Sequence, residues 1–284
     1  MEQYVNYLPQ FKGFGIADAE MEKMAKSLLV LKPEDYERLG CAVPKDDAPI
    51  VGLLLGREDG HYCSDEDLVK ALASAGLRVL FMNYSNHLRQ LSKCAALVLP
   101  GGCFNTPEWY YTDAKVADQG KYPNQRCRAY IECFKFAMAI GMPVLGICAG
   151  MQVMAAECGL KLYRSQDYVE TPLHHQTQER LAHYIDLLPN TSFSVMMGKQ
   201  WRLPVNSRHS ELLAPVRVQQ EELGIKNLPL NIYALATDGV PEAVGKMEKG
   251  LLGVQWHPEN YAAHGDEMQQ RIFNWLVEKA RNFQ

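Results

Sequence analysis

Cys148 has the sequence surroundings of a reactive cysteine. It lies in Gly146-Ile147-Cys148-Ala149-Gly150, after the apolar run 143–145 and before the stretch 151–157, which has a helical pattern. This order predicts a strand, a tight turn and a helix, the arrangement that lifts a nucleophile clear of a sheet. Flanking glycines leave room for the turn, and the N-terminus of the next helix favours thiolate over thiol. The pattern therefore predicts nucleophilic chemistry at this sulfur.

His257 and Glu259 can supply the base that such a thiol needs. A thiol requires a base to act at neutral pH, and the base requires a group that orients it. Residues two apart in an extended segment project to the same side, so Glu259 can lie beside the imidazole of His257. Triads are assembled in space, so the distance along the chain to Cys148 is no objection. We therefore predict a Cys-His-Glu triad.

Acyl transfer also needs donors for the developing oxyanion. One candidate is the backbone N–H directly after the nucleophile. The others belong to the Pro-Gly-Gly turn at 100–102, because glycine lets the backbone approach a substrate closely. The predicted oxyanion donors are Ala149, Gly101 and Gly102.

Alternating strand and helix patterns predict the elements that position these residues. Continuous apolar runs at 50–55, 77–82 and 95–99 indicate strands buried on both faces, and helical patterns separate them. Such β-α units predict an α/β fold in three layers, with a central, mostly parallel sheet and helices on both faces. Sites in these folds lie at the carboxyl ends of the strands, where Cys148 and the 100–102 turn both fall.

The second half of the chain has a different pattern. Short apolar runs are divided by Pro, Asn and Gly, which predicts an antiparallel portion of the sheet. The expected strands are 184–188, 193–197, 216–219, 232–236 and 243–247.

We assign residues 49–284 to one catalytic domain and residues 1–48 to an N-terminal extension that docks on it. Met21, Met24, Leu28 and Leu31 form a helical stripe in the extension. Such a stripe is typical of packing, although a surface for a partner stays open.

Composition excludes several classes of protein. The 284 residues are 47% hydrophobic, ample for a core, and the net charge of −4 is well mixed. This gives no electrostatic footprint for nucleic acid or an anionic membrane. We see no signal peptide and no apolar run near the roughly 18 residues of a membrane span. Eight cysteines without C-x-x-C favour a reducing cytoplasm over disulfides, and Cys94, Cys133 and Cys158 are expected in the core.

Three motifs resemble those of class I glutamine amidotransferases. They are Gly-Ile-Cys-Ala-Gly-Met-Gln at 146–152, Pro-Gly-Gly at 100–102 and Gly-Val-Gln-Trp-His-Pro-Glu at 253–259. Val-Asn-Ser-Arg-His at 205–209, and Thr-Asp-Gly at 237–239 before Glu242, resemble the γ-glutamyl-γ-aminobutyrate hydrolase branch, which is peptidase C26-like. The resemblance implies a flavodoxin-like fold over most of residues 49–279.

The resemblance also implies an activity. Cys148 would attack a γ-glutamyl amide, His257 would move the proton, Glu259 would orient His257, and glutamate would leave through a thioester. The implied partner is a small γ-glutamyl substrate, with no metal and no organic cofactor. The implied pocket residues are Gln152, Ser207 and His209, the last with a structural role equally open.

The chain departs from that branch at three positions. Ala149 stands where Arg usually follows the nucleophile, and Ser210 stands where a second His usually follows His209. Ala129 replaces Asp in the segment 128–132. The triad is intact, but these positions bear on the identity of the amine leaving group. The sequence leaves this identity open, and it also leaves open whether the chain forms a homodimer.

Two other functions stay open. One is a glutaminase subunit that delivers ammonia to a separate synthetase, and the other is a non-catalytic, γ-glutamyl-binding regulatory module. Trp109-Tyr110-Tyr111 is consistent with a lid, an acceptor wall or ordinary packing. His174, His175 and His183 lack acidic or Cys partners at metal-binding spacing, so we expect no metal site.

Overall fold

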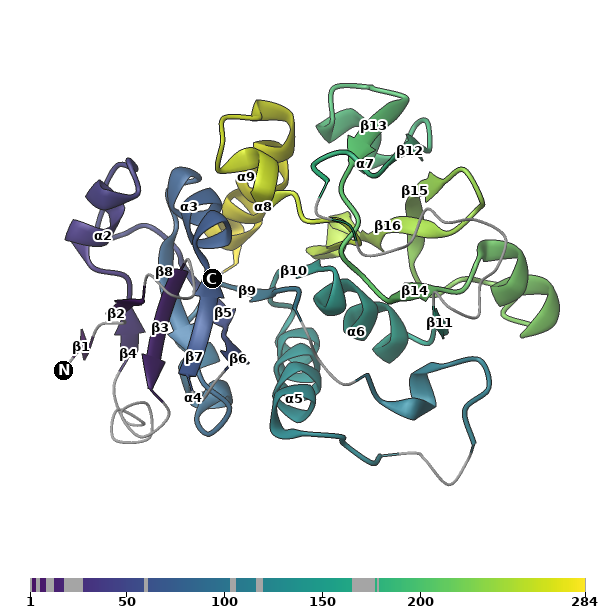
Figure 1. Cartoon of the computed structure of the whole chain (residues 1–284), viewed down its shortest axis with the longest axis horizontal. Helices are drawn as coiled ribbons and strands as arrows, with labels where there is room; N and C mark the ends of the chain where they lie inside the picture. The colour runs from purple at the N-terminus through teal and green to yellow at the C-terminus, as the bar shows by residue number, and fades with distance from the viewer. Residues whose placement is uncertain are drawn as a thin grey trace. The chain divides into compact units, whose positions relative to one another are not determined.

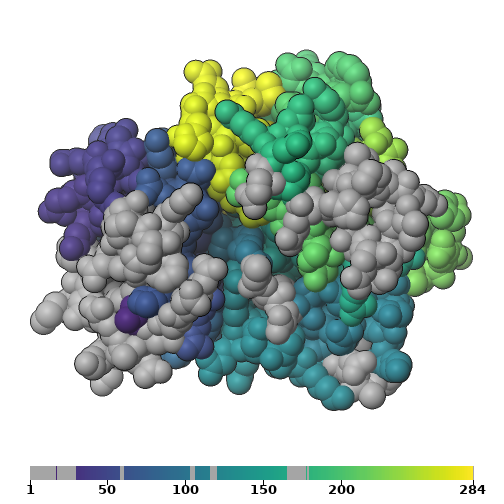
Figure 2. Space-filling view, viewed as in Figure 1, coloured from purple at the N-terminus to yellow at the C-terminus, as the bar shows by residue number. Residues whose placement is uncertain are grey.

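The computed structural model describes residues 2–3, 6–8, 13–17, 28–58, 61–102, 106–115, 120–164, 177 and 179–283, which are the coloured parts of Figure 1. Figure 2 gives a space-filling view of the same chain. The chain divides into two compact units. The first comprises Met1–Pro100, Glu132–Val144 and Pro258–Gln284, and the second comprises Gly101–Ile131 and Leu145–His257.

The first unit is built on a mostly parallel sheet. Its strand order is β1 (Glu2–Gln3), β4 (Leu28–Val30), β8 (Arg78–Met82), β5 (Ile50–Leu54) and β9 (Ala96–Leu99). Strand β5 runs parallel to both β8 and β9, and β4 runs antiparallel to β8. Every residue of β9 is buried. Because successive side chains of a strand point to opposite faces, both faces of this strand are covered.

Helices of the first unit pack on this sheet or on one another. They are α2 (Pro33–Arg38), α3 (Glu66–Ser74), α4 (His87–Leu91), α8 (Glu259–Ala262) and α9 (Glu267–Asn282), seen in Figure 1. Helix α3 contacts β8 and α9 contacts β9. A smaller antiparallel sheet has the order β2 (Asn6–Leu8), β3 (Gly13–Ala17), β7 (His61–Asp65) and β6 (Gly56–Glu58). The predicted α/β class is confirmed.

The second unit supplies the predicted antiparallel portion. After β10 (Val144–Ile147) the order is β17 (Leu251–Val254), β16 (Pro241–Lys246), β15 (Asn231–Ala236), β12 (His183–Leu187) and β13 (Arg202–Val205). Neighbours from β17 to β13 all pair antiparallel. Strands β11 (Leu162–Arg164) and β14 (Glu211–Leu213) form a separate pair in this unit. The unit also contains helices α6 (Ala149–Glu157) and α7 (Ser192–Met196). Helix α5 (Gln125–Ile140) has residues in both units.

Three expectations about secondary structure were wrong. Residues 193–197 form most of helix α7 rather than a strand, because the Thr191 side chain caps it by accepting from the Ser194 N–H. Residues 216–219 are helical rather than extended. Leu28 belongs to strand β4 rather than a helical stripe, because strand pairing overrides local periodicity. Leu28 pairs with Glu2 of β1, and the rest of β4 pairs with β8. Met21 and Met24 lie outside the described residues.

Cys94 and Cys133 are buried as predicted, whereas Cys158 is partly exposed. Burial raises the pKa of the Cys94 thiol from 9.0 to about 12. Below pH 9.0 this thiol is neutral in both the folded and the unfolded chain. As the pH rises from 9.0 to about 12, this thiol loses its proton only in the unfolded chain. The free energy of unfolding therefore falls over this range.

We expect Cys94→Ala to flatten the alkaline fall in the free energy of unfolding. Urea unfolding at several pH values between about 8 and 11 measures this slope. The slope is independent of the constant cost of the cavity that the substitution leaves. Parallel curves for the wild type and the variant would contradict the expectation.

Candidate active site

Cys148 lies on a strained turn between β10 and α6. Its backbone has φ 50° and ψ −110°, a conformation that residues with a side chain rarely adopt. Its N–H donates to the Val254 carbonyl at 2.8 Å, and its carbonyl accepts from the Gln152 N–H at 3.1 Å. Such strain persists only where the surroundings fix it, and it clusters at functional sites. The structure thus has the predicted strand, turn and helix.

Glycine lets this turn close. A Cβ on Gly146 would lie 2.8 Å from the carbonyl group of Gly150, so a side chain at 146 does not fit. Helix α6 begins at Ala149. The N–H groups of a first helical turn have no partner within their helix, and the role of the Ala149 N–H as an oxyanion donor stays a prediction.

Gly101 brings Cys148 and His257 together. A Cβ built on Gly101 would lie 3.1 Å from the Cβ of Cys148 and 3.1 Å from Nε2 of His257. It would also lie 2.5 Å from Cε1 of the imidazole. The Cβ of Cys148 and the imidazole of His257 therefore both lie close to one point, and that point is open because residue 101 has no side chain. All three residues belong to the second unit.

Arg126 orients the glycine turn, and the sequence reasoning did not find it. Its buried guanidinium donates to the Gly101 carbonyl and to the Tyr130 hydroxyl, both at 2.9 Å. In a trans peptide the next N–H points opposite to the carbonyl. The Gly102 N–H therefore points away from Arg126. Gly102 itself has φ 112°, a conformation that favours glycine.

Glu259 is the first residue of α8, in the first unit, and is 3% exposed. It follows His257 by two residues along the chain. Its role as the orienting carboxylate stays a prediction.

Two of the predicted pocket residues meet at one carbonyl. The buried Gln152 amide donates to the Glu211 carbonyl at 2.8 Å and to Oε1 of Gln255 at 3.1 Å. Nδ1 of His209 lies 2.9 Å from the same carbonyl. A carbonyl only accepts, so this nitrogen carries a proton. Both side chains are thereby fixed on the segment that follows β13.

Ser207 is fully buried, and its hydroxyl has no hydrogen-bond partner within the described part of the chain. An unpartnered buried hydroxyl is unusual and is available to a ligand. Contact of Ser207, Gln152 or His209 with a substrate stays a prediction.

Asn206 is a second residue that the sequence reasoning missed. Its side-chain oxygen accepts from the His257 N–H at 2.9 Å, and its amide nitrogen donates to the His257 carbonyl at 3.2 Å. The only sequence signal was its place in the 205–209 motif.

The aromatic segment 109–111 is packed on the second unit. The buried Tyr110 hydroxyl donates to Glu157 at 2.6 Å, and Arg164 lies over the Tyr111 ring at 3.8 Å. Burial, with Glu157 beside it, raises the pKa of Tyr110 far above its ordinary range. These contacts favour the interpretation as ordinary packing over a free lid.

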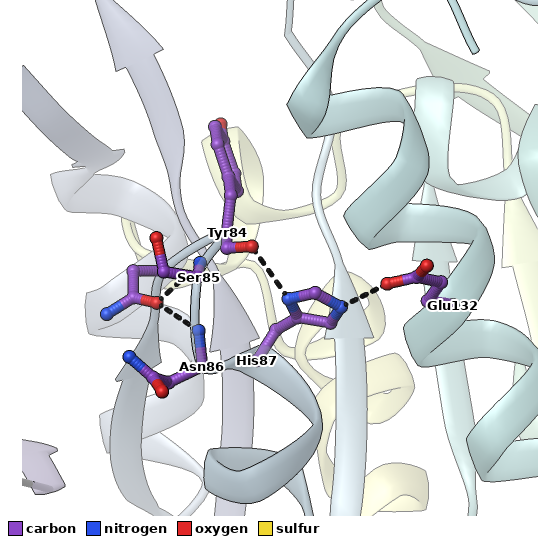
Figure 3. Close-up of polar contacts among 6 residues, drawn as sticks. Tyr84, Ser85, Asn86, His87 and Glu132 are labelled. Atoms are coloured by element: carbon purple, nitrogen blue, oxygen red, sulfur yellow. Dashed lines mark hydrogen bonds and ion pairs between the residues drawn. The ribbon is translucent and has the colours of Figure 1, made fainter. Parts of the chain in front are cut away.

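Glu132, from the family-like segment 128–132, pairs with His87 in the first unit. Oε2 of Glu132 lies 2.8 Å from Nε2 of His87, and Nδ1 lies 3.0 Å from the Tyr84 carbonyl (Figure 3). A carbonyl only accepts, so Nδ1 carries a proton. The pair holds the loop after β8 against α5.

Within the described ranges, no group of three His, Cys, Asp or Glu side chains is placed to hold a metal ion. His183 instead lies 3.4 Å from Glu242, both buried, and His174 and His175 lie outside those ranges. Of the described helices, none combines the length and the hydropathy needed to span a membrane.

Two of the relatives described next carry amidotransferase names, and the third is named as a synthase subunit. The glutamine amidotransferase-like protein YvdE of Lactococcus lactis is 28% identical, with 62% of this chain and 70% of the relative covered. A glutamine amidotransferase-like protein of Rickettsia prowazekii is 24% identical, with 74% and 86% covered. A subunit of imidazole glycerol phosphate synthase from Prochlorococcus marinus is 28% identical, with 67% and 81% covered.

Solved structures share the fold. The glutaminase domain of the Trypanosoma brucei protein CTPS, solved with acivicin bound, superposes with a TM-score of 0.59 at 13% identity. The match covers 83% of this chain and 95% of that domain. At this identity the likeness shows the fold alone.

The model of the peptidase C26 family matches residues 57–259, which include the elbow cysteine and both His257 and Glu259. That match spans well over half of the chain, and the fold agrees with it. The chain therefore belongs to the peptidase C26 family, within the class I glutamine amidotransferase-like superfamily.

Proposed function

We propose that this protein is a cysteine-dependent hydrolase of γ-glutamyl amides. The observation that carries the proposal is the approach of Cys148 and His257 to one point at Gly101, with the cysteine on a strained elbow. Membership of the peptidase C26 family and the amidotransferase-like relatives support amide chemistry of this general kind.

The proposed reaction has two stages. The sulfur of Cys148 attacks the γ-amide carbon, and its proton passes to His257. The C–N bond breaks as His257 gives that proton to the leaving amine, and a γ-glutamyl thioester remains. Water then attacks the thioester carbon and gives a proton to His257. The C–S bond breaks, the sulfur regains the proton, and glutamate leaves.

We propose roles for the remaining groups as well. The oxyanion of each stage would be stabilised by the N–H of Ala149 and by N–H groups of the Gly101-Gly102 turn. Glu259 would orient His257. Gln152, Ser207 and His209 would bind the glutamyl part of the substrate. A small amine such as γ-aminobutyrate would be the leaving group, in a cytoplasmic protein without a resident cofactor.

A panel of γ-glutamyl amines, including γ-glutamyl-γ-aminobutyrate and glutamine, tests this proposal through glutamate release. We expect turnover of at least one γ-glutamyl amine above that of glutamine. The matched controls are the α-glutamyl isomers, which carry the same groups with the amide displaced and should not be cleaved. No glutamate from any member, together with no labelling of Cys148 by diazo-oxo-norleucine, would refute the hydrolase and favour a binding module.

The second candidate is a glutaminase subunit that supplies ammonia to a synthetase. One relative is named as a subunit of imidazole glycerol phosphate synthase. This candidate predicts that glutamine is the best substrate of the panel, and that its turnover rises when a co-purifying synthetase is added.

A further inference from the structure

Asn206 holds the backbone of the proposed base from both sides. Its side-chain oxygen takes the His257 N–H at 2.9 Å, and its amide nitrogen reaches the His257 carbonyl at 3.2 Å. A backbone N–H can only donate and a carbonyl can only accept, so these contacts also fix which way the amide points. Asn206 is 1% exposed, so it makes these bonds away from bulk water.

His257 needs such a support because it lies beyond its strand. Strand β17 ends at Val254, and the Gln255 N–H still donates to the Glu242 carbonyl in β16 at 2.8 Å. His257 is two residues further on and is followed by Pro258, which has no N–H to bond. The side-chain amide of Asn206 bonds to the N–H and the carbonyl of His257, as the backbone of a neighbouring strand would.

The backbone on both sides of Asn206 is itself held by hydrogen bonds. It directly follows β13, where Val205 is paired with His183 of β12 and accepts from the Ala182 N–H at 2.8 Å. On its other side the Ser207 carbonyl accepts from the Thr177 N–H at 2.9 Å. The backbone on both sides of Asn206 is thus fixed, and so is the amide that it presents.

We propose that Asn206 is a positioning residue that sets the place of the His257 imidazole relative to the sulfur of Cys148. The inference rests on the proposed function, because it assigns His257 as the base. A displacement of about 1 Å in such a site costs about 10²-fold in rate. Holding both polar atoms of the His257 backbone limits the rotation that would carry the imidazole away from Gly101.

Asn206→Asp tests the proposal with little change of size. The carboxylate can still accept from the His257 N–H but cannot donate to its carbonyl, and two oxygens then face each other. We expect kcat for glutamate release to fall about 10²-fold with KM little changed. We also expect the pH dependence of Cys148 alkylation by iodoacetamide, followed by peptide mass spectrometry, to move toward that of His257→Ala.

Asn83→Ala is the matched control. Asn83 is also 1% exposed, and its side-chain oxygen accepts from the backbone N–H groups of Ser85 and Asn86 at 2.9 and 2.8 Å. It lies in the first unit and has no part in the proposed reaction. The control should lose stability while keeping kcat and the alkylation profile of the wild type.

The two readouts separate this inference from the proposed function. A wild-type alkylation profile and kcat in Asn206→Asp would overturn the positioning role, and so would equal losses in Asn83→Ala. If the wild type released no glutamate from any γ-glutamyl amide, the proposed function would fail. The alkylation profile, which needs no substrate, would still decide whether Asn206 positions the imidazole.

Discussion

Cys148→Ala should abolish glutamate release from γ-glutamyl amides while leaving the fold intact. Loss of the nucleophile of a triad costs a factor of at least about 10³ in kcat, because no thioester can form. Alanine keeps the Cβ, so the strained backbone at φ 50° is neither relieved nor worsened. Circular dichroism and thermal unfolding should therefore match those of the wild type.

The control for this substitution is Cys133→Ala. Cys133 is fully buried in α5, within the first unit, and makes no contribution to the proposed chemistry. Its replacement should lower stability and preserve turnover, which is the reverse pattern. Turnover retained in a purified Cys148→Ala protein would remove the sulfur from the mechanism.

Gly101→Ala should remove most activity with a modest loss of stability. The new methyl would lie 2.5 Å from Cε1 of the His257 imidazole and 3.1 Å from the Cβ of Cys148. The imidazole ring can move more readily than the backbone, so it would shift away from the sulfur. We expect a fall in kcat of at least about 10²-fold, with a cost of about 1–3 kcal/mol from overpacking.

Gly52→Ala is the control, because its new methyl group would be similarly crowded but away from the proposed site. A Cβ on Gly52 would lie 2.9 Å from the sulfur of Met82 and 3.1 Å from that of Cys94, inside the first unit. This variant should lose stability through overpacking and keep its kcat. Steady-state kinetics with thermal unfolding of both variants measures the contrast. Equal kcat values in the two would show that the approach of the imidazole to the sulfur does not depend on the missing side chain at Gly101.

The elements that could be predicted from the sequence are those whose signals all lie within one short segment. The elbow at Cys148 was predictable because glycine spacing, an apolar run and a helical pattern all occur within about fifteen residues. Strands β5, β8 and β9 were predictable within one or two residues, because strands buried on both faces require unbroken apolar runs.

Short runs without such agreement were predicted wrongly. The apolar residues 193–197 suit either a strand or a helix, and the capping hydrogen bond from Thr191 decided for α7. Leu28 lies in a strand because β4 pairs with β1 on one side and with β8 on the other, which no spacing along the chain encodes.

The sequence by itself thus determined the α/β class, the nucleophile elbow and the residue types available for acyl transfer. Only the tertiary structure decided which polar side chains form hydrogen bonds with the backbone around the candidate site. Arg126 fixes the Gly101 peptide, Asn206 fixes the His257 peptide, and Gln152 and His209 share one carbonyl. The physical reason is that a side chain's hydrogen-bond partner is chosen by the packing of distant strands, whereas residue spacing encodes only the conformation of its own segment.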